Sequence, residues 1–189
     1  MTISKLKSDL RLKMRDLRKK IDLAYRKQSE YNLLEQIRPL LQVSSNIAIY
    51  HAAGSEISLK NIIGYCLSQN EIKLYQPIAY FSSKNMRFEE VDSYNPPKSL
   101  FYQEDYQLLN ETKCYNLDLI LVPLLAVDQA GHRLGQGGGY YDTTFADPCF
   151  RPVLCGIGFD KQLIDSVPYD AWDLELDYFV SEKRLVKFK

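Results

Sequence analysis

The feature that most constrains the fold is an apolar strand that leads directly into a glycine-rich loop and then a helix. Asp118–Val122 (DLILV) is a short apolar run ended by Pro123, a pattern typical of a buried strand. Five of the nine glycines lie between residues 131 and 139, and a helix is predicted to begin near Gly139. A strand, loop and helix in this order form the building block of an α/β sheet.

Similar units recur along the chain. Strands are predicted at 46–50, 71–75, 86–91, 118–122, 151–157 and 178–180, and helices at about 4–25, 29–41 and 58–69. We expect Ser29 to be the N-cap of the second helix and Pro77 to close the second strand. The alternation predicts a three-layer α/β fold, with a mainly parallel sheet and helices on both faces. Ligands of such sheets bind beyond the carboxyl ends of the strands.

Charge and hydropathy exclude several classes of protein. The 189 residues carry 24 basic and 24 acidic side chains, which gives no argument for a nucleic-acid partner. No apolar run approaches the roughly 20 residues needed to cross a bilayer, and the N-terminus lacks the apolar core of a secretory signal. We therefore expect a soluble cytoplasmic protein with neither a membrane nor a nucleic-acid partner.

The overall neutrality hides a basic N-terminal segment. Residues 1–30 carry ten basic and four acidic side chains, a net charge of +6, and the remaining residues carry −6. An apolar stripe on one helix face comprises Leu6, Leu10, Met14, Leu17 and Ile21, and a basic stripe beside it comprises Lys7, Arg11, Arg15 and Arg18. The basic stripe is interpreted either as a solvated helix face or as cations directed at a phosphate or carboxylate.

The glycine-rich loop is a candidate anion site. Glycines permit successive backbone amides to point in one direction, and the helix that follows adds a partial positive charge. Arg133 precedes the loop, where a guanidinium can bind two phosphate oxygens. The loop matches neither the Walker A pattern nor the dinucleotide fingerprint. The alternative is a tight turn of small residues with no ligand.

Three carboxylates are candidate ligand contacts, each with a purely structural alternative. Asp142 is either a Mg²⁺ ligand beside bound phosphates or an acid in the first turn of a helix. Asp173 is either a second metal ligand or a turn residue. Glu56 follows the first predicted strand, and it could accept hydrogen bonds from a heterocycle or simply begin the next helix.

The segment Arg133–Asp142 (RLGQGGGYYD) resembles the signature of the 5-formyltetrahydrofolate cyclo-ligase family. The resemblance extends to Leu10-Arg11 in the basic helix, to Glu56 with its following helix, and to much of residues 156–182. It implies a Rossmann-like fold of the NagB/RpiA/CoA transferase type. It also implies a single domain over residues 1–189, with the basic N-terminal helix (about 4–25) packing over an ATP site.

The reaction implied by the resemblance is an ATP- and Mg²⁺-dependent ring closure, in which 5-formyltetrahydrofolate becomes 5,10-methenyltetrahydrofolate and ADP and phosphate are released. The resemblance assigns ATP to Lys7, Arg11, Arg133, Leu134, Gly135, Gln136, Gly137, Gly138, Gly139, Tyr140 and Tyr141. It assigns the folate to His51, Glu56 and Tyr141, and Mg²⁺ to Asp142 and Asp173. It implies no covalent nucleophile, and we expect a monomer that acts on these small molecules.

Two other functions remain as alternatives. Gln136, Gly138, Thr143 and Trp172 depart from residues common in the family, which fits a non-catalytic nucleotide- or folate-binding regulator on the same fold. RNA binding through the basic N-terminal segment is a third hypothesis, but overall neutrality and the lack of a basic sheet with exposed aromatics argue against it.

Overall fold

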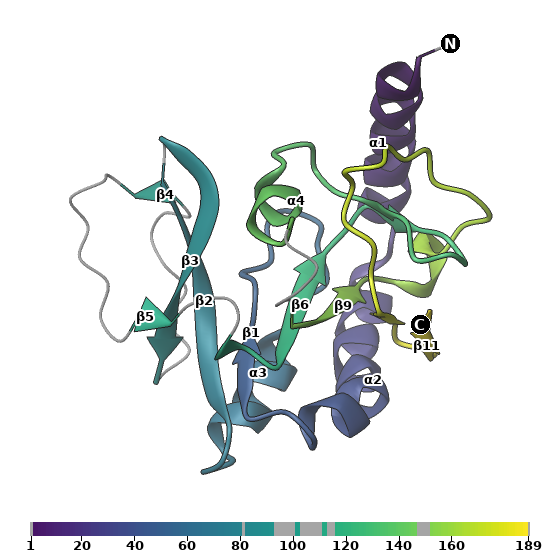
Figure 1. Ribbon diagram of the computed structural model, residues 1–189. Helices are drawn as coiled ribbons and strands as arrows, with labels where there is room; N and C mark the ends of the chain where they lie inside the picture. Colours follow the sequence, from purple (N-terminus) through teal and green to yellow (C-terminus); the bar gives the residue numbers. More distant parts are fainter. Residues whose placement is uncertain are drawn as a thin grey trace.

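The fold is built around one twisted, mainly parallel sheet (Figure 1). The computed structural model describes residues 2–80, 82–92, 101–102, 111–112, 116–146 and 152–188. The helices are α1 (Ile3–Lys19), α2 (Leu23–Leu41), α3 (Lys60–Leu67) and α4 (Tyr140–Thr144). The strands are β1 (Asn46–Ala48), β2 (Lys73–Tyr80), β3 (Ser83–Val91), β4 (Phe101–Tyr102), β5 (Glu111–Thr112), β6 (Leu119–Pro123), β7 (Ala126–Val127), β8 (Arg133–Leu134), β9 (Val153–Ile157), β10 (Tyr178–Val180) and β11 (Leu185–Lys187).

The strand order places the first and sixth strands at the centre of the sheet. Nine strands form it in the order β11-β10-β9-β6-β1-β2-β3-β5, and β4 pairs with β2. The central pairs from β10 to β2 are parallel, whereas β11 and β3 join their neighbours antiparallel. The predicted α/β fold with a mainly parallel sheet is therefore confirmed.

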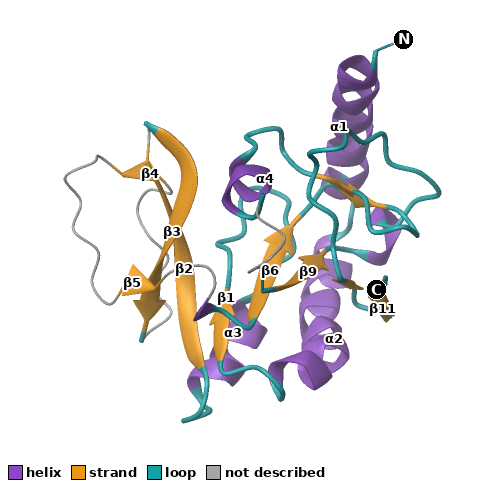
Figure 2. Cartoon of the chain, viewed as in Figure 1, coloured by secondary structure: helices purple, strands orange, loops and turns teal. Residues whose placement is uncertain are grey.

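Both faces of the sheet are buried, as expected for central parallel strands. On one face, α2 and α3 pack their apolar sides against alternate strand residues such as Ile47 and Leu121. On the other face, α4 and the loops around it cover the intervening residues, such as Ala48 and Ile120. Figure 2 shows α2 and α3 together below the central strands and α4 beside β6. None of the described helices is long and apolar enough to cross a membrane.

The N-terminal helix is shorter than the predicted span of about 4–25. It ends at Lys19, because Asp22 begins a new helix as an N-cap and accepts hydrogen bonds from the amides of Ala24 and Tyr25. The prediction of Ser29 as N-cap is wrong. Its hydroxyl lies inside α2 and donates to the carbonyl of Tyr25, one turn earlier.

Pro77 lies inside β2 rather than at its end, which corrects the predicted boundary. On one edge of β2, Pro77 is opposite Phe88 of β3. On the other edge, β1 pairs only as far as Tyr75 and β4 begins at Ala79. Proline is tolerated here because, among the described strands, none pairs with this position on that second edge.

Helix α1 packs across the small hairpin formed by β7 and β8, at the carboxyl end of β6. Met14 is 1% exposed and contacts a cluster that includes Ala126, Leu134 and Val167. This packing confirms the apolar stripe of α1 at its centre. It also places the basic stripe of α1 beside the glycine-rich loop.

Candidate active site between two cavities

The glycine-rich loop connects β8 to α4 and depends on left-handed backbone conformations. Gly137 has φ +102°, and Gly139, the N-cap of α4, has φ +76°. Residues with a side chain rarely adopt these angles, so glycine permits the loop to turn twice within three residues. A Cβ atom at Gly137 would lie 3.4 Å from Cζ of Arg11, so the loop also passes close to α1.

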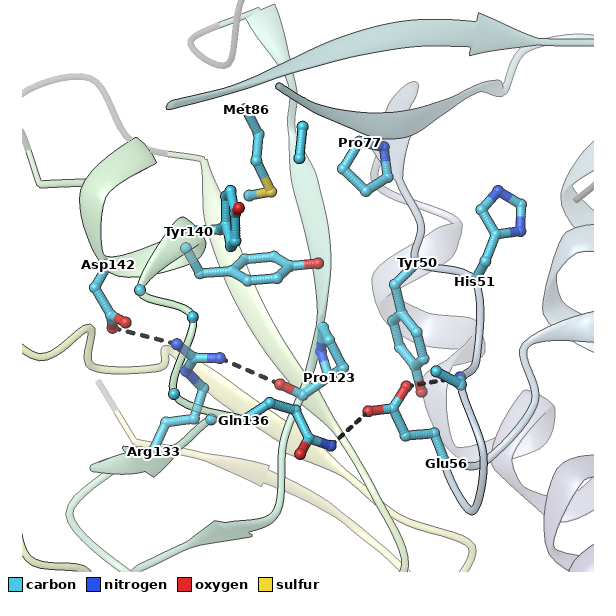
Figure 3. A pocket seen from close by; sticks show the side chains of 17 residues that line it. Tyr50, His51, Glu56, Pro77, Met86, Pro123, Arg133, Gln136, Tyr140 and Asp142 are labelled. Atoms are coloured by element: carbon cyan, nitrogen blue, oxygen red, sulfur yellow. Dashed lines mark hydrogen bonds and ion pairs between the residues drawn. The ribbon is translucent and has the colours of Figure 1, made fainter. Parts of the chain in front are cut away.

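Two cavities of different chemistry share this loop. Arg133, Gly135, Gly137, Gly139 and Asp142 line both of them. The first, here called the aromatic cavity, has a volume of about 300 Å³ and is also lined by Tyr50, His51, Ala53, Glu56, Pro77, Ala79, Met86, Pro123, Gln136, Gly138, Tyr140 and Tyr141 (Figure 3). The second, the cationic cavity, has a volume of about 490 Å³ and is also lined by Lys7, Arg11, Lys84, Leu134, Thr143, Ala146, Trp172 and Asp173.

Two cations of α1 reach the cationic cavity. Lys7 is buried, and its Nζ donates to Oδ2 of Asp170 at 2.6 Å and to Oδ2 of Asp173 at 2.5 Å. Burial alone would lower the pKa of Lys7, but these two hydrogen bonds outweigh it and the pKa is raised. Nε of Arg11 donates to the carbonyl of Gly135 at 3.0 Å. Lys7 is therefore charged at neutral pH, as an arginine always is, and both side chains line the cationic cavity.

Arg133 and Asp142 form an ion pair at the boundary between the cavities. NH2 of Arg133 lies 3.2 Å from Oδ1 of Asp142, and NH1 donates to the carbonyl of Pro123. The guanidinium also lies 5.4 Å from the ring centre of Tyr141. Oδ1 of Asp142 accepts a second hydrogen bond from the amide of Leu174. This geometry fixes Asp142 at the first turn of α4.

Asp142 and Asp173 fit a Mg²⁺ ion in number and chemistry. Mg²⁺ is commonly bound in proteins by one or two carboxylates together with phosphate oxygens and water. Arg133 and the amide of Leu174 donate to Oδ1 of Asp142, and Lys7 and the amide of Asp170 donate to Oδ2 of Asp173. As far as the structure describes the chain, the other oxygen of each carboxylate is left for a ligand. Among the described residues, no group of three or more acidic, histidine or cysteine side chains could form an all-protein metal cage.

Glu56 lies at the wall of the aromatic cavity and is held from three sides. Oε2 accepts from the amide of Ala53 at 3.0 Å, and Oε1 accepts from Nε2 of Gln136 at 3.1 Å. NH2 of Arg18 lies 3.8 Å from Oε1. Figure 3 shows Glu56 and Asp142 at opposite ends of this cavity. The Gln136 contact joins the predicted folate acid directly to the glycine-rich loop.

Tyr50 and Tyr141 give the cavity its aromatic walls. Burial raises the pKa of both phenols well above the usual value, so both are protonated at neutral pH. The hydroxyl of Tyr50 already donates to the carbonyl of Ile57. Tyr141 packs near Phe145 of the core. These rings offer flat apolar surfaces to a ligand in the cavity.

His51 lines the same cavity as a neutral imidazole. Nε2 of His51 lies 2.9 Å from Oε1 of Gln76, whose Nε2 donates to Glu89, so the imidazole must carry its proton on Nε2. Burial lowers the pKa of His51, which keeps the ring neutral at neutral pH. Its Nδ1 is then a buried acceptor, and it has no hydrogen-bond partner within the described part of the chain.

Comparison with known proteins identifies the family. The model of the 5-formyltetrahydrofolate cyclo-ligase family matches residues 3–182. The chain belongs to this family. A 5-formyltetrahydrofolate cyclo-ligase of Haemophilus influenzae is 27% identical over 179 residues, which cover 90% of this chain and 94% of that protein. The cyclo-ligase of Escherichia coli K12 is 24% identical over 155 residues, which cover 78% of this chain and 83% of that protein.

Solved structures agree with the cyclo-ligase fold. A 5,10-methenyltetrahydrofolate synthetase from Aquifex aeolicus superposes with a TM-score of 0.80 at 24% identity, covering 97% of this chain and 93% of that one. A synthetase from Mycoplasma pneumoniae gives a TM-score of 0.73 at 20% identity, covering 93% and 98%. At this identity the structures support the fold. The resemblance drawn from the sequence, and the expectation of an enzyme of the cyclo-ligase family, are confirmed.

The structure divides the residues that the cyclo-ligase resemblance assigns to ATP. Lys7, Arg11 and Leu134 line the cationic cavity, although the Leu134 side chain is in the core. Four others line the aromatic cavity instead, namely Gln136, Gly138, Tyr140 and Tyr141. The three residues that the resemblance assigns to the folate, His51, Glu56 and Tyr141, all line the aromatic cavity. Asp173 lines the cationic cavity, and Asp142 lines both.

Several lining residues were not found from the cyclo-ligase sequence. Lys84 and Met86 come from β3, whose strand pattern gives no sign that it borders the site. Tyr50 is the last residue of the predicted strand 46–50, and a place at the carboxyl end of a buried strand is a usable signal. Arg18 was part of the predicted basic stripe, but its contact with Glu56 depends on the tertiary fold.

Proposed function

We propose that this chain converts 5-formyltetrahydrofolate to 5,10-methenyltetrahydrofolate with consumption of ATP in the presence of Mg²⁺, releasing ADP and phosphate. The observation that carries the proposal is that one glycine-rich loop separates an aromatic cavity from a cationic one. A reaction that joins a folate to a phosphoryl donor needs these two environments side by side. Membership of the cyclo-ligase family supports the same reaction.

The cationic cavity is assigned to the ATP phosphates. Lys7, Arg11 and Lys84 line it together with the loop glycines, so positive side chains and main chain surround one volume. Catalysis of phosphoryl transfer depends on positioning and on stabilising charge rather than on covalent chemistry by the protein. We accordingly expect no covalent enzyme intermediate.

Asp142 and Asp173 are the residues that would hold Mg²⁺ in this cavity. When bound beside the phosphates, the ion would neutralise charge on their oxygens. The pairing of Lys7 with Asp173 means that the ammonium and the ion would both lie close to the same carboxylate. Arg133 keeps Asp142 in place from the other side.

The aromatic cavity is assigned to the folate heterocycle. Glu56 is an acceptor for N–H groups, His51 lines the same cavity, and the protonated Tyr141 phenol is a donor for a carbonyl oxygen. Met86, Pro77 and the tyrosine rings provide apolar contact with a flat ring. The arrangement directs the polar edge of the heterocycle toward Glu56 and leaves its reacting end near the loop.

The reaction then proceeds in two chemical steps. The formyl oxygen attacks the γ-phosphorus of ATP, the bond from that phosphorus to the bridging oxygen breaks, and ADP leaves. The second folate nitrogen attacks the activated formyl carbon, the carbon–oxygen bond breaks, and phosphate leaves as that nitrogen loses its proton. The contribution of the protein is to hold the two substrates next to each other across the glycine-rich loop.

The test is a turnover assay with purified protein, ATP, Mg²⁺ and 5-formyltetrahydrofolate, followed by absorbance of the methenyl product. We expect product to appear only when all components are present. Folded protein that gives no ATP-dependent product would refute the proposed activity. Tight binding of both ligands by calorimetry without turnover would instead support the non-catalytic regulator.

A further inference from the structure

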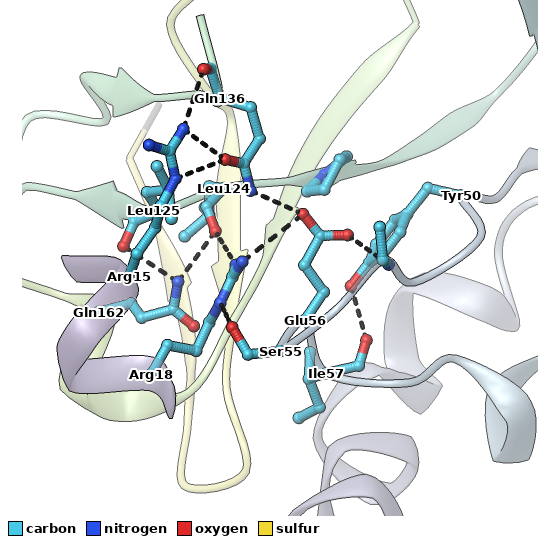
Figure 4. Close-up of polar contacts among 12 residues, drawn as sticks. Arg15, Arg18, Tyr50, Ser55, Glu56, Ile57, Leu124, Leu125, Gln136 and Gln162 are labelled. Carbon is cyan, nitrogen blue, oxygen red and sulfur yellow. Dashed lines mark hydrogen bonds and ion pairs between the residues drawn. The ribbon is translucent and has the colours of Figure 1, made fainter. Parts of the chain in front are cut away.

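A buried arginine outside both cavities contacts the predicted folate acid. Arg18 of α1 is 3% exposed, and NH2 of its guanidinium lies 3.8 Å from Oε1 of Glu56 (Figure 4). It does not line the aromatic cavity, whereas Glu56 and Gln136 do. Any effect of Arg18 on a ligand in that cavity must therefore act through its neighbours.

The guanidinium joins two segments that form walls of the aromatic cavity. Nε of Arg18 donates to the hydroxyl of Ser55 at 2.9 Å, directly before Glu56. NH1 donates to the carbonyl of Leu124 at 3.1 Å, directly after the wall residue Pro123. The loop after β1 and the segment after β6 are consequently held at a fixed separation by one planar group.

The carboxylate is the charge partner of this arginine. A buried guanidinium is costly unless it is paired, and burial lowers the pKa of Arg18 while the nearby Glu56 opposes that shift. Within the described part of the chain, Glu56 is the one carboxylate that forms an ion pair with Arg18. Gln136 makes the shorter contact to the same oxygen, 3.1 Å, so the arginine supplies counter-charge and leaves the carboxylate facing the cavity.

We propose that Arg18 is a positioning residue for the folate, which sets the orientation of the Glu56 carboxylate without contacting the substrate. This inference rests on the proposed function. It distinguishes Arg18 from Lys7 and Arg11 on the same helix, which line the cationic cavity. The basic stripe of α1 thus serves both sides of the glycine-rich loop.

The test is a double-mutant cycle between Arg18→Met and Glu56→Gln, read as KM values in the turnover assay and as Kd values for 5-formyltetrahydrofolate by calorimetry. We expect Arg18→Met to raise the folate KM and Kd by about tenfold or more, because the carboxylate loses its charged partner. The KM for ATP should stay within about twofold. In the Glu56→Gln background, the same change should alter folate affinity by less than about twofold, since contacting residues act non-additively.

A matched control is Arg26→Met. NH1 of Arg26 donates to the carbonyl of Ser55 in the same loop, and its other described hydrogen bonds go to the main-chain carbonyls of Ile21 and Arg18. It should leave the folate KM within about twofold. Arg18→Lys keeps the positive charge but loses the planar guanidinium, so it should raise the folate KM less than Arg18→Met does. If Arg18→Met does not fold, Arg18→Lys is the variant that tests the role of Arg18.

The inference is overturned if the fold-changes in folate Kd caused by Arg18→Met and Glu56→Gln simply multiply in the double variant. It is also overturned if Arg18→Met raises the KM values for ATP and folate together, or if Arg26→Met raises the folate KM as much as Arg18→Met does. Its failure differs from failure of the proposed function. If wild-type protein binds 5-formyltetrahydrofolate without turnover, the proposed activity is refuted. The double-mutant cycle can then still be measured through the Kd values for 5-formyltetrahydrofolate. Wild-type turnover with an unchanged folate KM in Arg18→Met would refute only the role of Arg18.

Discussion

Nζ of Lys7 lies 2.5 Å from Oδ2 of Asp173, so a predicted phosphate ligand and a predicted magnesium ligand are bound to each other. Asp170 contacts the same ammonium at 2.6 Å but does not line the cationic cavity. The two aspartates are therefore equivalent as partners of Lys7 and different as potential ligands of an ion in the cavity. That difference separates a structural role from a metal role.

The first prediction compares Asp173→Asn with Asp170→Asn. If Asp173 binds Mg²⁺, Asp173→Asn should lower kcat by about a hundredfold, because a charged ligand to the ion is lost, and should raise the Mg²⁺ concentration needed for half-maximal rate. Asp170→Asn should change both by less than about threefold. A magnesium titration of the rate checks this. If the two variants change kcat and the Mg²⁺ requirement equally, Asp173 is a partner of Lys7 and not a Mg²⁺ ligand.

The second prediction concerns Gly137→Ala in the glycine-rich loop. A residue with a side chain at φ +102° costs about 1–3 kcal/mol, and the added methyl group would lie in van der Waals contact with the Arg11 guanidinium. We expect the KM for ATP to rise by about tenfold or more. Gly64→Ala is the control, since its Cβ would meet no atom within 4 Å and it lies inside α3. An unchanged ATP KM in Gly137→Ala would contradict the role given to the loop.

The sequence is sufficient for those features that depend on local pattern. The apolar run of β6 and the heptad-like stripe of α1 predict a buried strand and an amphipathic helix, and both are confirmed. The glycine-rich loop with Asp142 behind it is also correctly placed before a helix. These features are set by residues within one or two turns of each other, so no knowledge of the fold is needed.

Features that depend on contacts between distant segments are not predictable in this way. Pro77 reads as a strand end, and it is permitted inside β2 because no described strand pairs with it on one edge. The contacts of Arg133 with Asp142 and with the carbonyl of Pro123 also depend on the fold, and its phosphate contact stays a prediction. Lys84 enters the cationic cavity only because the β2–β3 hairpin lies beside α4. Each outcome depends on tertiary partners.

The third prediction uses the single tryptophan as a reporter. Trp172 is 75% exposed and lines the cationic cavity, next to Asp173. We expect its fluorescence to change in intensity or wavelength when ATP and Mg²⁺ are added, because the indole would leave water on contact with the nucleotide. Trp172→Phe should remove the signal. Calorimetry serves as the control for ATP binding. If wild-type protein binds ATP by calorimetry but its tryptophan fluorescence does not change, the nucleotide binds elsewhere.

The fourth prediction is a pH dependence of stability at His51. Burial lowers the pKa of this imidazole in the folded chain below the usual value of about 6.5. As the pH falls below that value, the unfolded chain binds the proton first, so folding stability decreases from about pH 6.5 downward. Urea unfolding at pH 7.5, 6.5 and 5.5 measures this loss. His51→Asn should show a smaller loss than wild type, and an identical pH dependence in the two proteins would contradict the assignment.

The proposed function requires that the two substrates bind on opposite sides of one loop. A crystal structure with Mg²⁺, a non-hydrolysable ATP analogue and 5-formyltetrahydrofolate tests this directly. We expect the triphosphate beside Lys7 and Arg11 and the folate heterocycle beside Tyr50 and Glu56, with the glycine-rich loop between them. A triphosphate bound away from Gly137, or both ligands in one cavity, would contradict it.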